Sequence, residues 1–293
     1  MSETSEPVHT HPIMTPYIPP GCSTLAAMTS KQQIRLGIQG FPGVGKTWSA
    51  LTFPKPVVVN LNKGLGVHIG REDVISVERS LFGKQHEVKD RLLDWLNEHG
   101  PRFSSEQTLI LDSLTDLETY YHLWYECNKM QFLTKTGKLD DFAEWSVKEK
   151  YFDELFNLFQ GLSCDIVVIT HETEQPDKQY PGQAITYSGK IRPLFTGKIK
   201  DKLTHTFTDW FRQGCCDKPS IDKITPDMLS SWKVSIDEMK AMLNTFPDKT
   251  LYYWQTQGDD KFDAKASSLV SPPKFMPANF SSFTKYMRKI TKP

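Results

Sequence analysis

The sequence lacks an excess of either charge, a long apolar run and a signal for export. Its 293 residues carry 35 Lys and Arg side chains and 35 Asp and Glu side chains, so the formal net charge is zero. This balance excludes a protein that coats nucleic acid through overall positive charge, although it allows a local basic patch. No segment approaches the ~18 consecutive apolar residues of a membrane-spanning helix, and the N-terminus lacks the apolar core of a signal peptide. We therefore expect no membrane partner and a cytoplasmic protein.

The chain is also poor in cysteine. Its five cysteines form no CxxC pair, and Cys215 and Cys216 are adjacent. Structural zinc sites are usually built from ligand pairs at such spacings, so no zinc site is predicted. Reduced thiols in an intracellular protein fit this pattern. A chain of this length buries about three quarters of its unfolded surface, so it needs neither disulfides nor a metal to hold its core.

The order of apolar segments predicts an α/β fold. Residues 1–32 are rich in proline and poor in large aliphatic side chains, which predicts a disordered tail. Beyond this tail, short runs of β-branched residues alternate with segments of helical periodicity. Strands are expected at 34–39, 56–61, 74–77, 108–112 and 165–171, and helices at 46–53, 86–99, 114–131 and 140–160. This alternation is typical of a parallel sheet with helices on both faces.

The second half of the chain is less regular. Residues 172–190 are polar and contain Gly and Pro, which predicts a long loop. Further strands are expected at 203–213 and 251–257. Between them, residues 214–248 are predicted to form an insertion with a short helix near 235–244.

Aromatic side chains stand out in two places. In the helix predicted at 140–160 they recur with aliphatic ones at nearly helical spacing, which predicts core positions for Phe142, Trp145, Tyr151, Leu155 and Phe159. In the segment 268–293 they are interleaved with Lys and Arg and no acidic residue. This second segment is predicted to be a basic extension that binds DNA, packs on a neighbouring subunit or is solvated.

The strongest functional signal is the segment Gly40-Phe-Pro-Gly-Val-Gly-Lys-Thr47, which matches the phosphate-binding motif G-x-x-x-x-G-K-[ST] in full. It lies between a predicted strand and a predicted helix, as that motif requires. Glycines allow the backbone to curl so that its N–H groups point at phosphate oxygens. Lys46 would then reach the β- and γ-phosphates, and the Thr47 hydroxyl would coordinate Mg²⁺. The alternative is a glycine-rich turn without function.

Two polar residues end buried strands further along the chain. Asp112 ends the run Leu109-Ile-Leu-Asp, which is the arrangement of a Walker B acid that holds Mg²⁺ beside the phosphate loop. His171 ends the run that begins at Asp165, a position from which a side chain can sense the γ-phosphate. A structural role is the alternative for this single histidine.

Taken in order, five segments resemble the phage-encoded RecA-like P-loop ATPases of the Sak type. They are GFPGVGKT, PVVVNLNKGL, TLILDSLTDLETY, IVVITHE and PLFTGKIKDKLTHTFTDWF, and the resemblance covers about residues 34–267. It implies ATP and Mg²⁺ as cofactors, single-stranded DNA as a partner, and annealing or strand exchange beside a single-strand-binding protein. It also implies a homo-oligomer, as a filament or ring, in the cytoplasm of a phage host. The domains would be a tail at 1–32, a RecA-like ATPase domain at 33–267 and the extension at 268–293.

The resemblance also implies roles for individual residues. Lys46, Asp112 and His171 would be catalytic, and Thr47 and Asp112 would hold the metal. The residues expected to bind the nucleotide are Gly40, Gly43, Val44, Gly45, Lys46, Thr47 and Trp48. RecA-like ATPases complete their site with a cation from the neighbouring subunit, and Lys265 is the residue expected to act in trans here. A plain surface lysine is the alternative.

Two segments correspond to DNA-binding loops of such proteins. Residues 172–190 contain side chains that suit phosphate contacts and base stacking, namely Lys178, Tyr180, Tyr187 and Lys190. Residues 132–139 contain Lys135 and Lys138. For both segments the alternative is a solvated connection without DNA contact.

One position departs from the family pattern. RecA-like enzymes usually carry a glutamate just after the second strand, where it activates the attacking water, whereas this chain has Asn62. An amide can orient water but cannot accept its proton. Hydrolysis is therefore expected to be slow unless Glu172 or Asp116 serves instead. The main alternative function is a nucleotide-gated assembly module with little ATPase activity. A small-molecule phosphotransferase has less support, because residues 172–190 contain no arginine for a lid.

Overall fold

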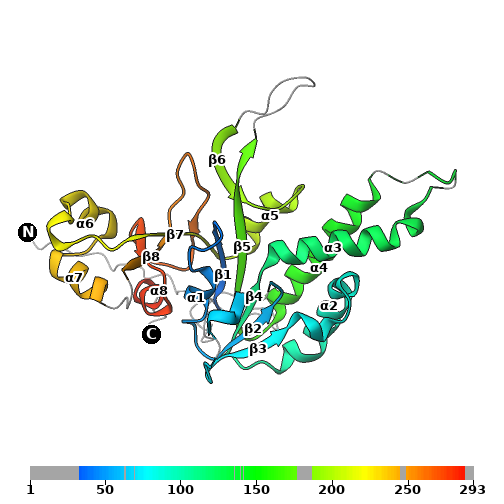
Figure 1. Cartoon of the computed structure of the whole chain (residues 1–293), viewed down its shortest axis with the longest axis horizontal. Helices are drawn as coiled ribbons and strands as arrows, with labels where there is room; N and C mark the ends of the chain where they lie inside the picture. Colours follow the sequence, from blue (N-terminus) through cyan, green and yellow to red (C-terminus); the bar gives the residue numbers. More distant parts are fainter. Residues whose placement is uncertain are drawn as a thin grey trace, which may run out of the picture. The chain divides into compact units, whose positions relative to one another are not determined.

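The computed structural model describes residues 33–287 except positions 63, 69, 135, 139, 141, 177–186 and 245–248. The predicted tail at 1–32 lies outside the described residues. The described part forms a single unit by its internal contacts. Its centre is a ten-stranded sheet, and helices cover both faces of that sheet (Figure 1).

Six neighbouring strands of the sheet run parallel. In spatial order they are β3 (Ile75–Glu78), β2 (Pro56–Asn60), β4 (Thr108–Asp112), β5 (Asp165–Pro176), β1 (Arg35–Gly40) and β7 (Asp209–Asp217). Every residue of β1, β2 and β4 is buried. The near-continuous apolar sequence of β2 and β4 follows from this position, because both faces of a parallel sheet are covered.

Four antiparallel strands extend this parallel core. They are β8 (Thr250–Gln255) beside β7, β10 (Phe275–Pro277) beside β8, the short β9 (Lys265–Ala266) beside β7, and β6 (Tyr187–Pro193) beside the end of β5. The sheet is therefore mixed and not purely parallel as predicted. The predicted α/β fold class is confirmed, since the parallel strands alternate with helices and β1 leads into the phosphate loop.

Alternate residues of each strand pack against different helices. On β2, Val57 and Val59 face one apolar cluster and Val58 faces the other. The first cluster contains the helices α2 (Val88–His99), α3 (Leu114–Asn128), α4 (Ala143–Gly161) and α5 (Ile199–Thr206). The second contains α1 (Lys46–Ala50) and α8 (Phe280–Tyr286). A smaller third cluster joins α6 (Pro226–Trp232) and α7 (Ile236–Asn244) to β8.

The region predicted as a long loop is instead part of a β-hairpin. Strand β5 continues past His171 to Pro176, and β6 pairs with it antiparallel (Figure 1). Polar residues favour a loop, but here the backbone pairing of β5 with β6 determines the structure. Charged side chains of the hairpin such as Glu172 and Arg192 form ion pairs. The part of the loop at 177–186 lies outside the described residues.

The strand expected at 203–213 is wrong in its first part. Residues Ile199–Thr206 form α5, and β7 begins at Asp209. Ile199, Leu203 and Phe207 recur at a spacing of four and are all buried, so the helical period decides this segment. Further along, α7 coincides with the short helix predicted near 235–244, whereas α6 was not predicted.

The helix predicted at 140–160 is present as α4, but two of its expected core residues are exposed. Phe142 precedes the helix and is 80% exposed, and Trp145 in the first turn is 46% exposed. The buried face of α4 begins three residues later and includes Tyr151, Leu155 and Phe159, as predicted. The apolar spacing therefore indicates the correct face but extends beyond the part of the helix that is covered.

The C-terminal aromatic segment packs on the core. Met276 of β10 and Phe283 of α8 are buried, and the Phe283 ring lies 6.0 Å from the rings of Phe53 and Phe211. The asparagine Asn279 caps α8 by accepting a hydrogen bond from the N–H of Ser282. From the sequence, these aromatic side chains could bind DNA, pack on another subunit or be solvated. In the structure, Phe283 packs on the core of its own chain.

A matched pair of substitutions tests this packing. Phe283→Ala should lower the free energy of unfolding by about 3–5 kcal/mol, because it leaves a cavity in the core. Phe142→Ala removes the same side chain from an exposed position and should change it by less than about 0.5 kcal/mol. Urea denaturation followed by circular dichroism measures both. Equal effects would contradict the description of the C-terminal segment as core.

Candidate functional site

The phosphate loop joins β1 to α1 and depends on glycine at two positions. Gly43 and Gly45 have φ values of 81° and 77°, which side chains with a Cβ rarely adopt. At Gly45 a Cβ would also lie 2.7 Å from the ring of Tyr252. The loop curls around Lys46, whose Nζ donates hydrogen bonds of 2.8 Å to the carbonyls of Gly40 and Phe41. A curled loop of this kind presents backbone N–H groups to an anion.

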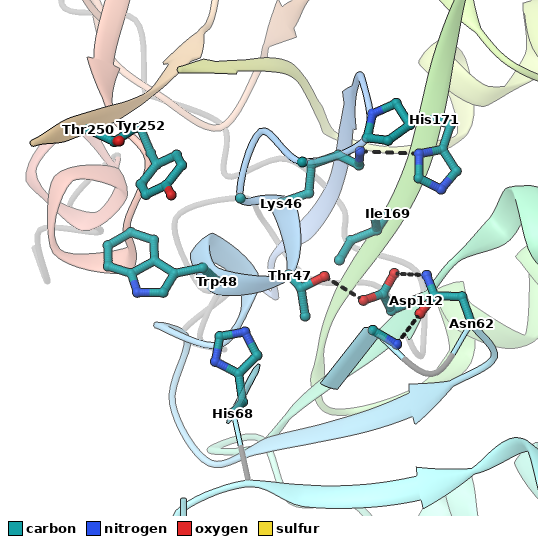
Figure 2. A pocket seen from close by; sticks show the side chains of 14 residues that line it. Lys46, Thr47, Trp48, Asn62, His68, Asp112, Ile169, His171, Thr250 and Tyr252 are labelled. Atoms are coloured by element: carbon teal, nitrogen blue, oxygen red, sulfur yellow. Dashed lines mark hydrogen bonds between the residues drawn. The ribbon is translucent and has the colours of Figure 1, made fainter. Parts of the chain in front are cut away.

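Strand order brings four predicted residues to the same place. Strand β5 lies between β1 and β4, so the carboxyl ends of the three strands meet at one edge of the sheet. The Thr47 hydroxyl donates a 2.7 Å hydrogen bond to Asp112 Oδ2. Lys46 Nζ lies 3.3 Å from Nδ1 of His171 (Figure 2). Lys46, Thr47, Asp112 and His171 thus form one cluster.

Asn62 belongs to the same cluster. Its side-chain nitrogen donates a 3.1 Å hydrogen bond to Asp112 Oδ1, and its side-chain oxygen accepts a 2.7 Å bond from the N–H of Gly64. Both oxygens of Asp112 are therefore engaged, one by Thr47 and one by Asn62. The amide that replaces the expected glutamate is held in a fixed orientation beside the acid.

Burial shifts the pKa of each charged member of the cluster. It lowers the pKa of Lys46 to about 8, although the negative charges of Asp112 and Glu172 act in the opposite direction. Burial raises the pKa of Asp112, which the hydrogen bonds from Thr47 and Asn62 oppose. It also lowers the pKa of His171, and the neighbouring Lys46 charge acts in the same direction. At pH 7 this histidine is therefore neutral, and the lysine is mostly protonated.

The cluster opens into a cavity of about 480 Å³. This volume lies within the range of small-molecule sites. Beside the residues above, it is lined by residues that the sequence did not single out, namely His68, Thr250 and Tyr252. No local signal indicates Thr250 and Tyr252, because β8 reaches the phosphate loop only through its antiparallel pairing with β7. His68 ends the short helical segment Gly64–His68 that follows β2. Trp48, expected at the site, lines the cavity as well.

The oxygen donors of the site fit Mg²⁺. Among residues 33–287, as far as they are described, no group of three or more His, Cys, Asp or Glu side chains could hold a metal. Magnesium is usually bound through one or two protein oxygens together with substrate phosphates. The Thr47 hydroxyl and the Asp112 carboxylate are two such oxygens, and they are already adjacent.

The two acids considered as replacements for a catalytic glutamate are both engaged. Glu172 is buried and accepts bidentate hydrogen bonds of 2.9–3.2 Å from Arg212, and the N–H of Phe41 donates to it as well. Asp116 accepts a hydrogen bond from the hydroxyl of Ser113 at the start of α3. Neither acid is among the described residues that line the cavity, of which Asp112 is the one carboxylate.

The other predicted residues lie away from the cavity. Lys265 on β9 lines a separate pocket with Arg192, Lys200 and His205. Lys190 on β6 forms an ion pair of 3.3 Å with Asp263. Lys178 and Tyr180 lie outside the described residues, and so does Lys135, while Tyr187 begins β6. The connection at 132–139 between α3 and α4 lies apart from the β5–β6 hairpin (Figure 1).

Both the sequence and the fold are similar to those of known proteins. A family model described as an AAA domain matches residues 32–265. None of the curated proteins matches the chain. Among solved structures, the RadB recombinase is 12% identical, with a TM-score of 0.33 over 61% of this chain and 74% of that one. The ATPase EscN of enteropathogenic E. coli is 12% identical, with a TM-score of 0.38 over 61% of this chain and 42% of that one.

The phosphate loop, the strand order and the contact between Thr47 and Asp112 define a P-loop nucleotide-binding protein. Since the family model covers most of the chain, the protein belongs to the AAA-domain family. The two structural similarities concern the fold alone. The chain spans less than half of EscN. Within the described residues, no helix has the length and apolarity that crossing a membrane requires.

The lowered pKa of Lys46 predicts how nucleotide affinity depends on pH. Phosphate binding favours the charged lysine, and in the free protein this charge is lost as the pH rises through about 8. Above that pH, binding must take up a proton, so the Kd for MgATP should rise by up to about tenfold per pH unit. Lys46→Arg, which stays charged, should flatten the profile between pH 7 and 9. Calorimetric titration across this range checks both, and a flat profile in the unmodified protein would contradict the assignment.

Proposed function

We propose that the protein is an ATP-binding recombination protein of the phage Sak type, which binds single-stranded DNA and promotes annealing or strand exchange. The observation that carries this proposal is the continuity of β5. One strand holds His171 beside Lys46 and then forms one side of the β5–β6 hairpin. The state of the bound phosphates can therefore be transmitted along one continuous strand to the hairpin, which is the proposed DNA-binding element.

The charge of the hairpin region supports a DNA partner. Residues 187–206, from β6 to the end of α5, contain five Lys and Arg side chains and one aspartate, although the chain as a whole is neutral. Lys198 in this segment is exposed, and Lys200 is partly exposed. Lys198 and Lys200 can attract a phosphate backbone independently of its sequence. Lys190, Arg192 and Lys202 also form ion pairs with neighbouring carboxylates.

A series of contacts also connects the hairpin to the phosphate loop. The N–H of Ile191 on β6 donates a 2.8 Å hydrogen bond to the carbonyl of Lys261. The next residue, Phe262, lies with its ring 3.8 Å from the guanidinium of Arg212. Arg212 holds Glu172, which in turn accepts the N–H of Phe41 in the phosphate loop. This chain of contacts supports a second physical connection between DNA and nucleotide.

At the nucleotide, the residues of the cluster would divide the work. Lys46 would exchange its two loop carbonyls for phosphate oxygens, and neutral His171 beside it would respond to the γ-phosphate. Thr47 and Asp112 would hold Mg²⁺, which neutralises charge on the β- and γ-phosphates when bound. In an oligomer, Lys265 of a neighbouring copy is proposed to supply the positive charge that completes the site at the γ-phosphate.

The alternative is a nucleotide-gated assembly module with little ATPase activity. Asn62 favours it, because an amide stands beside Asp112 where a base is expected. The engagement of Glu172 by Arg212 and of Asp116 by Ser113 supports it further. Both functions share ATP binding and assembly, and they differ in whether DNA stimulates turnover.

Steady-state ATP hydrolysis with and without single-stranded DNA separates the two functions, with Lys46→Ala as the blank. The recombination proposal predicts slow basal turnover and clear stimulation by DNA, because the hairpin and the phosphate loop are connected. Turnover that DNA leaves unchanged, with ATP still bound, would favour the assembly module.

DNA binding through the hairpin region is tested by its dependence on salt. Replacing both Lys190 and Lys200 with alanine removes two expected phosphate contacts. The slope of log K against log salt should become shallower by about 1.4, since each contact on a single strand contributes about 0.7. Lys240→Ala, which removes a partly exposed lysine of α7, is the matched control and should leave the slope unchanged. A double variant that behaves like the control would rule out DNA binding at the hairpin.

A further inference from the structure

One end of the nucleotide cavity is aromatic. Trp48 of α1 and Tyr252 of β8 line it together, with ring centroids 5.5 Å apart and planes inclined by 33°. Both rings are partly buried and pack with one side against the small core formed by α6 and α7. The rings touch each other, so a flat ligand fits against the aromatic surface rather than between the two rings.

This aromatic surface lies at the end of the cavity away from the metal ligands. In Figure 2, Trp48 and Tyr252 lie on one side of Lys46 and Thr47, and Asp112, Asn62 and His171 lie on the other. A ligand whose phosphates occupy the loop therefore has its remaining part beside the aromatic pair. In a nucleotide that part is the sugar and the base.

We propose that Trp48 and Tyr252 form the wall on which the nucleotide base stacks, and that this wall favours purine over pyrimidine nucleoside triphosphates. The inference rests on the proposed nucleotide function of the same cavity. Stacking on an aromatic surface grows with the area of the base and does not depend on its hydrogen-bonding edge. A two-ring base therefore covers more of the wall than a one-ring base.

The polar residues near the wall do not add strong selection among purines. The side chains of His68 and Thr250 line this end of the cavity. Burial and the nearby Arg71 lower the pKa of His68, so it is neutral at pH 7 and offers one donor and one acceptor. Asn62 is the one side-chain amide and Asp112 the one carboxylate among the described residues that line the cavity. They are hydrogen-bonded to each other at the phosphate end. ATP and GTP should therefore bind with similar affinity.

Tyr252 also has a second contact that fixes its position. A Cβ at Gly45 would lie 2.7–2.8 Å from two carbons of the Tyr252 ring, so the ring packs directly on the phosphate loop. The glycine required there by its positive φ also leaves room for the ring. The aromatic wall and the phosphate loop are thus in direct contact.

The test compares ligands with and without a base. Calorimetric titration measures the Kd values of MgATP, MgCTP and magnesium tripolyphosphate for the full chain and its variants. We expect tighter binding of ATP than of CTP. Trp48→Ala and Tyr252→Ala should each weaken ATP binding by about 5- to 100-fold, the range found for base–aromatic stacking. Both should leave tripolyphosphate binding within about twofold, and Tyr252→Phe should bind ATP like the unmodified protein.

Trp145→Ala is the control, because it removes an exposed indole outside this cavity and should change no Kd. If neither alanine variant changes the ATP affinity while ATP binding still depends on Lys46, the aromatic wall is overturned. The proposed function is then unaffected. An equal loss of ATP and tripolyphosphate binding would also overturn it, because the base would then contribute nothing. Failure of the unmodified protein to bind either ligand would overturn the proposed function as well.

Discussion

The hydrogen bond between the Thr47 hydroxyl and the Asp112 carboxylate depends on one constraint, the parallel pairing of β1, β5 and β4. Because the three strands run in the same direction, their carboxyl ends lie at one edge of the sheet. The phosphate loop after β1, the acid that ends β4 and the histidine on β5 then meet without any long connection. If β5 were not between the other two strands, His171 could not approach Lys46 while Asp112 approaches Thr47.

Strand β7, together with the antiparallel β8, completes the site that β1, β4 and β5 begin. On β7, the side-chain amide of Gln213 donates a 2.7 Å hydrogen bond to the Val44 carbonyl and so holds the phosphate loop from its other side. Its oxygen accepts from the indole N–H of Trp254 on β8. Pairing of β8 with β7 also delivers Tyr252 to Gly45. The part of the sheet that appears irregular in sequence therefore adds Thr250 and Tyr252 to the lining of the cavity.

Much of the fold and of the site could be predicted where a local pattern determines the structure. The complete phosphate motif and the apolar run that ends in Asp112 indicated the correct elements, and the structure brings their side chains together. Prediction failed where a segment takes its structure from distant partners. The arms of the hairpin are polar in sequence and become strands through their pairing with each other, and the exposure of Phe142 depends on where neighbouring elements end. Tyr252 was missed because its place beside Gly45 arises from strand pairing, which leaves no mark on nearby residues.

The central claim is that the nucleotide site and the β5–β6 hairpin form one mechanical unit through β5. Hydrogen exchange of backbone amides, followed by mass spectrometry, tests it most directly. We predict that a slowly hydrolysed ATP analogue with Mg²⁺ slows exchange in the phosphate loop and also in β6 at 187–193, and that Lys46→Ala abolishes both effects. Protection confined to the phosphate loop and Asp112, with exchange in β6 unchanged, would contradict the account.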